Sequence, residues 1–191
     1  MTETTSDKSV VRVGLLGCGN VGASLVQLVE ARGDEIAART GTRLEIARVA
    51  VRSLTRKRPV HLDDAVLTRD ASEVVTDPSV DVVVEVIGGI EPARELILAA
   101  MAAGKPVVTA NKELLANHGA ELYAAASEAG VDLLFEAAVA GGIPILRPLR
   151  ESLAGEDVRR IMGIVNGTTN FILTRMSEQG TGYGEALAEA Q

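Results

Sequence analysis

A glycine-rich turn constrains the fold of this chain more than any other feature of its sequence. The turn spans residues 17–22 and reads GCGNVG, a G-x-G-x-x-G pattern. Residues 10–16 before it form a short β-branched run typical of a buried strand. After it, apolar residues recur at helical spacing to about residue 38. A strand, this turn and a helix in that order form the fingerprint of a dinucleotide-binding βαβ unit.

Each glycine of the turn has a physical role in such a unit. Gly17 permits the tight turn, Gly19 lets the backbone approach a pyrophosphate, and Gly22 lets the helix pack closely on the strand. The phosphates would then lie on free N–H groups at the positive end of the helix. A glycine turn with a purely structural role is the alternative interpretation.

The pattern continues as an alternation of strands and helices with short connections. Residues 52–69 are polar and basic at first and are interpreted mostly as a loop. Further strands are expected over residues 44–51, 80–87, 106–109 and 131–135, and further helices over residues 91–103 and 113–129. This alternation predicts an α/β fold, a Rossmann-type doubly wound parallel sheet.

The character of the sequence changes near Pro144. A helical stretch is expected over residues 149–153, a strand over 158–165, a helix from Phe171 to about Met176, and the start of another helix over 183–191. We therefore divide the chain into a disordered tail (1–9), a dinucleotide-binding domain (10–146) and the first elements of an incomplete α+β domain (147–191). A chain that stops inside an amphipathic helix is expected to be a piece of a longer protein.

Composition narrows the class of function. The 19 Lys and Arg against 26 Asp and Glu give a net charge of −7, and the chain has two Phe, two Tyr and no Trp. Acidity and scarce aromatic rings argue against a nucleic-acid partner. One cysteine and two histidines are too few for a disulfide framework or a zinc centre. Without a long apolar stretch or a signal peptide, we expect a cytoplasmic protein with no membrane span.

The residues after the second expected strand bear on the cofactor. An acid at this position binds the ribose 2′-hydroxyl of NAD, whereas an arginine suits the 2′-phosphate of NADP. Here Arg52 follows the strand, and Arg56, Lys57 and Arg58 come soon after it with no acid nearby. This pattern favours NADP(H), with Arg52 as the nearest phosphate partner and Arg56 or Lys57 as helpers. A solvated loop is the alternative, and use of NAD(H) stays open.

Two further strand ends face the same crevice in a sheet of this kind. The third strand carries Glu85 and ends at Gly88, where backbone can lie against the sugar or nicotinamide of a cofactor. Glu85 has a catalytic interpretation and an equally plausible one in which it pairs with backbone amides. The next strand ends at Thr109, and Lys112 in the following first turn opposes the helix dipole. We favour a functional role for Lys112 over a neutral surface position.

Residues 136–144 follow the last strand of this sheet and are small and glycine-rich up to Pro144. One carboxylate and several main-chain carbonyls would make an oxygen-rich set that suits a hard cation rather than zinc. A plain loop that crosses between domains is the alternative.

Taken together, five motifs resemble homoserine dehydrogenase. They are the glycine turn and residues 85–89 (EVIGG), 109–112 (TANK), 135–144 (FEAAVAGGIP) and 163–170 (GIVNGTTN). The resemblance runs from about Val10 to Gln191. It implies reversible NAD(P)H-dependent reduction of L-aspartate 4-semialdehyde to L-homoserine, a step towards threonine, methionine and isoleucine.

The resemblance also implies roles for individual residues. Cofactor contacts are implied for Asn20, Val21, Arg52, Thr109 and Lys112, with Lys112 in a supporting role near the reacting centre. A monovalent cation, typically sodium, would be bound by Glu136, Val139, Gly141 and Ile143, largely through main-chain oxygens. The substrate crevice would be lined by Asn166, Gly167, Thr168 and Thr169. The second domain would bind substrate and join two copies into a homodimer when the protein is full length.

Members of the family continue with a Glu-x-Asp-Pro segment and then an Asp and a Lys that support proton transfer. Because the chain ends at Gln191, we expect the main catalytic acid beyond that residue and little activity from residues 1–191 alone. Two alternatives are a non-catalytic module that binds NADP(H) and another Rossmann amino-acid dehydrogenase.

Overall fold

The computed structural model describes residues 9–164 and 166–191, and the chain divides into two compact units after Gly141. We call residues up to Gly141 unit 1 and residues from Gly142 unit 2, and each is described by itself.

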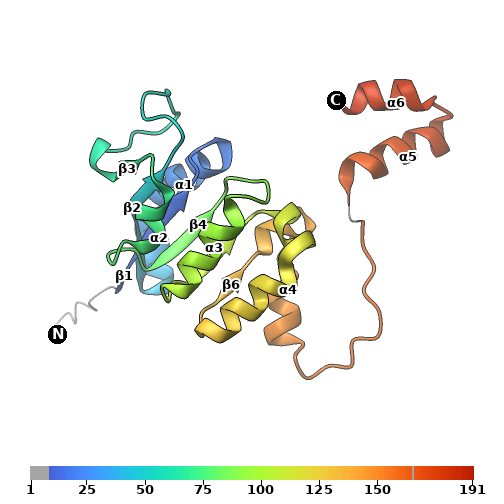
Figure 1. The fold of residues 1–191 in the computed structure, drawn as a ribbon. Coiled ribbons are helices and arrows are strands. Elements are labelled where there is room, and N and C mark those ends of the chain that lie inside the picture. The colour runs from blue at the N-terminus through green and yellow to red at the C-terminus, as the bar shows by residue number, and fades with distance from the viewer. Residues whose placement is uncertain (1–8, 165) are drawn as a thin grey trace, which may run out of the picture. The chain divides into compact units, whose positions relative to one another are not determined.

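Unit 1 is built on one sheet whose six strands all pair in parallel, in the order β3-β2-β1-β4-β5-β6 (Figure 1). The strands are β1 (Ser9–Leu16), β2 (Thr42–Ala50), β3 (Leu67–Thr68), β4 (Val82–Glu85), β5 (Val107–Thr109) and β6 (Leu133–Leu134). This is the strand order of a Rossmann sheet. Successive strands are added on one side of β1 up to β3 and on its other side from β4 onward, so the switch point lies between β1 and β4. The predicted doubly wound parallel sheet is confirmed.

Helices cover both faces of the sheet because alternate strand residues are apolar on both sides. The helices of unit 1 are α1 (Asn20–Thr40), α2 (Ala71–Thr76), α3 (Ala93–Ala102) and α4 (Lys112–Ala129). On one face, Leu15 and Val49 pack with Val26 of α1. On the other face, strand residues such as Leu16 and Val83 pack with α2, α3 and α4. The fold therefore has three layers, with the carboxyl ends of the strands along one edge.

The ends of the long helices follow local sequence signals. Gly41 and Gly130 come directly after α1 and α4 and adopt left-handed backbone conformations, with φ of 74° and 65°. The side chain of Asn111 caps α4 by accepting a hydrogen bond from the amide of Leu114 at 3.1 Å. These ends lie within two residues of the predicted ones, because glycine and asparagine end and begin helices through local chemistry.

Residues 52–69 are mostly loop, as predicted, but the segment also contains two short elements that the sequence did not reveal. A 3₁₀ turn (Asp64–Val66) and the strand β3 lie inside the segment. The amide of Val51 donates to the carbonyl of Thr68 at 2.8 Å, which continues the pairing of β3 with β2. A two-residue strand is too short to show any alternation in sequence, so only its partner reveals it. At the other end of unit 1, Ser9 belongs to β1, whereas residues 1–8 of the predicted tail lie outside the described residues.

Unit 2 contains a π-helical turn (Pro148–Ser152) and the helices α5 (Gly167–Gln179) and α6 (Tyr183–Ala190). Arg175 of α5 forms an ion pair with Glu189 of α6 at 2.6 Å. The helix predicted from Phe171 begins earlier, because the Asn166 side chain accepts a hydrogen bond from the amide of Thr169 at 2.8 Å.

The strand predicted over residues 158–165 is wrong for residues 158–164, which form no strand, and Val165 lies outside the described residues. A strand needs a neighbour to satisfy its backbone groups. In the described part of unit 2 there is no strand for this segment to pair with, and its apolar side chains are exposed.

Over the described residues, no helix combines the length and the apolar character needed to cross a bilayer.

Candidate functional site

The turn between β1 and α1 is held closely against the neighbouring strands. The amide of Gly17 donates to the carbonyl of Ala50 at 3.0 Å, and Gly17 has a φ of +98° that side chains disfavour. A Cβ atom added to Gly22 would lie 2.2 Å from the carbonyl oxygen of Gly17. Gly17 and Gly22 are therefore required by the fold itself.

Gly19 is different, because the fold places no such demand on it. A Cβ atom added there would meet nothing within 4 Å, and its φ of −83° suits residues with a side chain. Gly19 is the N-cap of α1, no side chain caps the helix, and its first turn holds no acid. The N-terminus of a 21-residue helix thus presents its backbone amides without a competing carboxylate. A glycine here leaves room for a ligand that approaches the backbone.

A cavity of about 500 Å³ lies in front of this turn, at the carboxyl edge of the sheet. It is formed by the glycine turn, by the segments that follow β2, β3 and β4, and by the start of α3. Its lining residues are Gly17, Cys18, Gly19, Ala50, Val51, Arg52, Ser53, Arg56, Arg58, Arg69, Ala71, Val86, Ile87, Gly88, Glu91, Pro92 and Leu96. The volume is within the usual range of small-molecule sites, roughly 300–1,000 Å³.

The charged side chains of the cavity are unusual for a chain with a net charge of −7. Its lining includes four arginines and one acid, Glu91. The arginines are Arg52, Arg56, Arg58 and Arg69, which follow the ends of β2 and β3. Like charges repel, so such a cluster in an acidic protein is best explained by an anion that it binds.

Arg58 contributes a positive charge to the cavity lining, and Cys18 contributes no negative charge. The guanidinium of Arg58 donates to the main-chain carbonyls of Ser53 and Arg56, while its Nε is buried without a hydrogen-bond partner among the described residues. Burial raises the pKa of the Cys18 thiol, and the positive charge of Arg58 partly offsets this shift. The thiol therefore stays protonated at neutral pH, and it adds no negative charge beside the arginines.

A buried network joins the ends of β4 and β5 below the cavity. The Glu85 carboxylate is fully buried and accepts hydrogen bonds from the amides of Ile87 at 2.7 Å and Gly88 at 3.2 Å. Its other oxygen accepts from the hydroxyl of Thr109 at 2.6 Å. The structure thus gives Glu85 the backbone-pairing role, in which it shapes the turn after β4.

The same network extends to the start of α4. The Thr109 hydroxyl accepts from the amide of Asn111 at 3.0 Å, and the Asn111 side chain donates to the carbonyl of Gly89 at 2.6 Å. Because the Thr109 hydroxyl is used in both directions and is buried, it orders the edge of the sheet.

The predicted cofactor residues form three groups, of which the first lines the cavity. Gly17, Gly19, Arg52 and Gly88 line it. Asn20, Val21 and Gly22 form the first turn of α1, whereas Thr109 and Lys112 lie at the end of β5 and the start of α4. Lys112 is exposed and has no ion-pair partner within 4 Å among the described residues. The roles themselves stay predictions.

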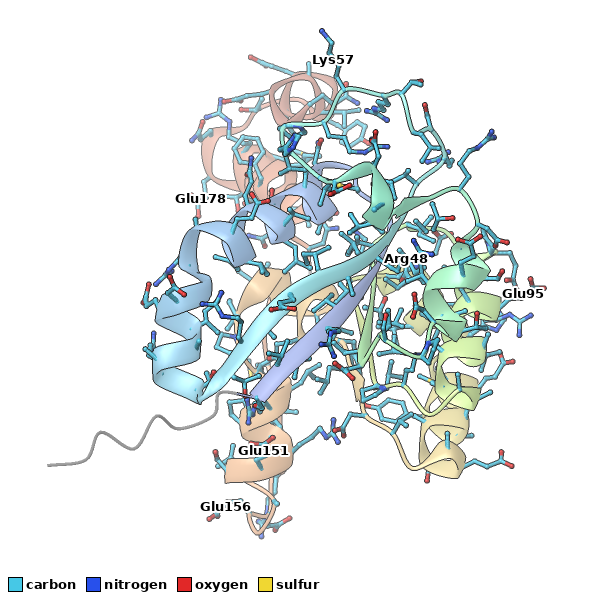
Figure 2. All side chains as sticks on the ribbon, turned by 90° about the vertical axis from the view of Figure 1, so that its left-hand side faces the viewer. Arg48, Lys57, Glu95, Glu151, Glu156 and Glu178 are labelled. Atoms are coloured by element: carbon cyan, nitrogen blue, oxygen red, sulfur yellow. The ribbon has the colours of Figure 1, made fainter. Side chains whose placement is uncertain are left out.

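The structure separates the two suggested helpers of Arg52. Arg56 lines the cavity, whereas Lys57 is exposed at the outer end of the loop and points away from the sheet (Figure 2). Sequence reasoning missed Arg69, because it follows the undetected strand β3, and missed Glu91, because no local pattern marks the turn before α3 as part of the cavity. Residues 66–68 before Arg69 are too few to show a period, so the sequence carries no local signal for it.

The residues predicted to bind a cation are divided between the units. Glu136, Val139 and Gly141 belong to unit 1, and Ile143 belongs to unit 2. Ala140 and Gly141 have positive φ angles of 55° and 62°, so the main chain is turned sharply there. Among the side chains that the structure describes, no group of three or more His, Cys, Asp or Glu could hold a metal ion. A site of main-chain oxygens stays a prediction.

The predicted substrate residues lie at the start of α5. Gly167 and Thr168 line a second cavity of about 350 Å³ within unit 2, together with Phe171 and with Glu189 and Ala190 at the end of α6. The Asn166 side chain accepts a hydrogen bond from the Thr169 amide and so caps the N-terminus of α5.

Two family models match the chain. The model described as homoserine dehydrogenase, NAD binding domain, matches residues 17–136, which include the glycine turn and the network below the cavity. The model described as homoserine dehydrogenase matches residues 144–191.

Individual relatives agree with these matches. The homoserine dehydrogenase of Bacillus subtilis is 49% identical over 95% of this chain, and that of Corynebacterium glutamicum is 53% identical over 95%. The chain spans 42% and 41% of the length of these two relatives.

Solved structures give the same result. The crystal structure of a homoserine dehydrogenase from Thiobacillus denitrificans has a TM-score of 0.84 and 46% identity, over 96% of this chain and 42% of that one. A hyperthermophilic archaeal homoserine dehydrogenase in complex with NADPH has a TM-score of 0.78 and 30% identity, over 95% of this chain and 60% of that one. The chain described here belongs to the homoserine dehydrogenase family.

Proposed function

We propose that unit 1 binds NADP(H) at the cavity in front of Gly19. The observation that carries this proposal is the open space at Gly19 beside an uncapped helix N-terminus and an arginine-lined cavity. Backbone amides of the first turn of α1 would bind the pyrophosphate, as in other glycine-turn sites. The match to an NAD-binding domain supports a nicotinamide cofactor.

The arginines support NADP(H) over NAD(H). Arg52 follows β2, where the ribose of a dinucleotide lies in this fold, and no acid that would bind a 2′-hydroxyl accompanies it among the residues directly after β2. Arg56, Arg58 and Arg69 add positive charge to the same cavity. The archaeal relative that binds NADPH supports the same choice. NAD(H) is expected to bind more weakly, because it lacks the group that these arginines attract.

The reaction that we propose is the reversible reduction of L-aspartate 4-semialdehyde to L-homoserine, carried out by the whole protein. NADPH supplies the hydride, and the chain supplies binding and orientation. Lys112, exposed at the start of α4 beside the network that shapes the crevice, has a supporting role as a cation near the reacting carbonyl. The chain spans 41–42% of the curated relatives named above, so the complete activity is assigned to a protein that contains these residues.

The domain assignment is part of the same proposal. Residues 10–146 form the dinucleotide-binding domain, and residues 147–191 begin a substrate domain that also joins two copies of the protein. The division after Gly141 and the family models, which end at residue 136 and begin at residue 144, support a boundary in this region, a few residues before 146. Asn166, Gly167, Thr168 and Thr169 are proposed to line the substrate crevice, and the oxygen-rich residues Glu136, Val139, Gly141 and Ile143 to bind sodium.

The experiment that tests the function has two parts. Titration of the 191-residue chain with NADPH, followed by nicotinamide fluorescence, should give saturable binding. Homoserine-dependent reduction of NADP⁺ should then be detectable with a full-length protein that contains these residues, and the 191-residue chain alone should show little activity. In the full-length protein, Lys112→Ala should lower the rate without removing NADPH binding. Absence of saturable binding would contradict the proposal at its first step, whatever the result of the assay.

A further inference from the structure

The cavity in front of Gly19 is lined by two chemically distinct sets of residues. The glycine turn and the four arginines suit phosphate groups. The apolar part of the lining includes Val51, Ala71, Val86, Pro92 and Leu96. Apolar walls of this kind suit a flat ring, which gains from contact on both of its faces.

The proposed function determines which ring this is. A dinucleotide phosphate carries its 2′-phosphate on the ribose that also bears adenine, whereas the nicotinamide lies beyond the pyrophosphate. Because the arginines and the apolar walls line the same cavity, the ring that lies next to the arginines is adenine. The apolar part is therefore the place for the base of the cofactor.

Glu91 is the acid among the lining residues, and its carboxylate is held in place. Its Oε1 accepts a hydrogen bond from Nε of Arg94 at 2.5 Å, and Arg94 also donates to Glu121 of α4 at 2.8 Å. The other oxygen, Oε2, accepts only a long bond of 3.4 Å from the amide of Glu95. A carboxylate can accept about four hydrogen bonds, so Glu91, which lines the cavity and has 44% of its side chain exposed, keeps unused acceptor capacity.

A negative charge in a phosphate-binding cavity costs affinity unless it is offset or used. The hydrogen bond to Glu91 raises the pKa of the Arg94 guanidinium, so Arg94 keeps its positive charge and offsets the charge of Glu91. An ionised carboxylate is an acceptor only, and the exocyclic amino group of adenine is a donor. The two groups are therefore complementary.

We propose that Glu91 recognises the adenine base of the cofactor by accepting a hydrogen bond from its exocyclic amino group, with Arg94 as the positioning residue. The proposal rests on the NADP(H) function argued above and goes beyond it, because it assigns the residue that distinguishes adenine from other bases.

The test uses a cofactor analogue that replaces the recognised group. In reduced nicotinamide hypoxanthine dinucleotide phosphate, a carbonyl oxygen replaces the amino group of adenine and N1 carries a hydrogen, so an acceptor takes the position of the amino donor. The 191-residue chain is titrated with NADPH and with this analogue, and the two dissociation constants are compared. We expect the chain to bind NADPH about tenfold more tightly, the usual effect of one hydrogen bond to a charged group at a half-exposed site.

The variant Glu91→Gln tests the residue directly, because an amide can present either an acceptor or a donor to the base. We expect the preference for NADPH over the analogue to fall from about tenfold to about twofold or less. Glu95→Gln is the matched control, since Glu95 has the same charge four residues later in the first turn of α3, lies outside the cavity lining and points outward (Figure 2). It should keep the full preference.

The possible failures can be told apart. Equal affinity of the unmodified chain for the two ligands would overturn the role of Glu91 and leave NADP(H) binding intact. An unchanged preference in Glu91→Gln would overturn it as well. Failure of both ligands to bind would remove the proposed function, and the role of Glu91 with it.

Discussion

At the scale of single residues, position after a strand decides which side chains reach the cavity. Arg52 and Arg69 follow β2 and β3 directly and line it, and Arg56 returns to it from the loop. Lys57, one residue later, lies outside the lining and is exposed. A positive charge in this loop is therefore not enough to identify a residue that binds phosphate. Arg56 and Lys57 are neighbours in the sequence, but only Arg56 lines the cavity.

Replacing Arg52 by alanine should weaken binding of NADPH about tenfold or more, because it removes a charge-assisted hydrogen bond to the 2′-phosphate. Binding of NADH, which has no such phosphate, should change by about twofold or less. Fluorescence titration of both cofactors gives the two ratios.

Lys57→Ala is the control for this comparison, since it removes the same charge from the same loop and should leave both affinities nearly unchanged. If Arg52→Ala weakened NADH and NADPH equally, Arg52 would not be the partner of the 2′-phosphate.

At the scale of elements, the approach of α1 to β1 depends on the glycine turn. Gly22 is in contact with the backbone of Gly17, whereas the Cβ position of Gly19 faces open space. The two glycines look equivalent in the sequence pattern, but the structure assigns one to folding and leaves the other for a ligand.

The variants Gly22→Ala and Gly19→Ala should therefore fail in different ways. The Gly22→Ala side chain would clash with a carbonyl at 2.2 Å, and the free energy of unfolding should fall by about 1–3 kcal/mol. Gly19→Ala should change it by about 1 kcal/mol or less, because its φ is negative and the space is open.

Urea unfolding measures the free energy of unfolding of both variants. NADPH titration measures cofactor binding, and Gly19→Ala should bind NADPH about tenfold more weakly or not at all. A Gly19→Ala variant that binds NADPH normally would show that no phosphate lies against this turn.

The helices and strands differ in how well the sequence predicts them. Helices α1 and α4 were predictable because periodicity, Asn111 and the glycines at their ends are local signals. Strand β3 was not, because two residues carry no period and the strand exists only through pairing with β2. The strand expected at 158–165 had a suitable alternation, but alternation does not supply a partner. Local chemistry can thus be read directly, whereas pairing depends on the rest of the fold.

Some residues of the candidate site can likewise be predicted from local sequence, and others cannot. The glycines and Arg52 follow from the pattern of one βαβ unit. The role of Glu85 was ambiguous in sequence, since only its contacts with the amides of Ile87 and Gly88 and with Thr109 distinguish a structural acid from a catalytic one. No local pattern marks the turn before α3, which holds Glu91, as part of the cavity.

At the scale of the whole molecule, every residue that lines the cavity belongs to unit 1. The ends of β1, β2, β3 and β4 converge there, and the local excess of arginine contrasts with an overall charge of −7. Cofactor binding is therefore expected to be a property of unit 1, with unit 2 contributing the beginning of the substrate domain. If this assignment is right, bound NADPH protects segments of unit 1 and leaves the helices of unit 2 unchanged.

Amide hydrogen exchange of the 191-residue chain, measured with and without saturating NADPH, tests this claim most directly. Amides that bind phosphate or are covered by the cofactor should exchange more slowly, as should the segments they order. We predict protection at residues 17–22, 51–58 and 86–92, with none along α5 and α6. Protection confined to residues 167–190, or no protection at residues 17–22 while NADPH is bound, would contradict the account.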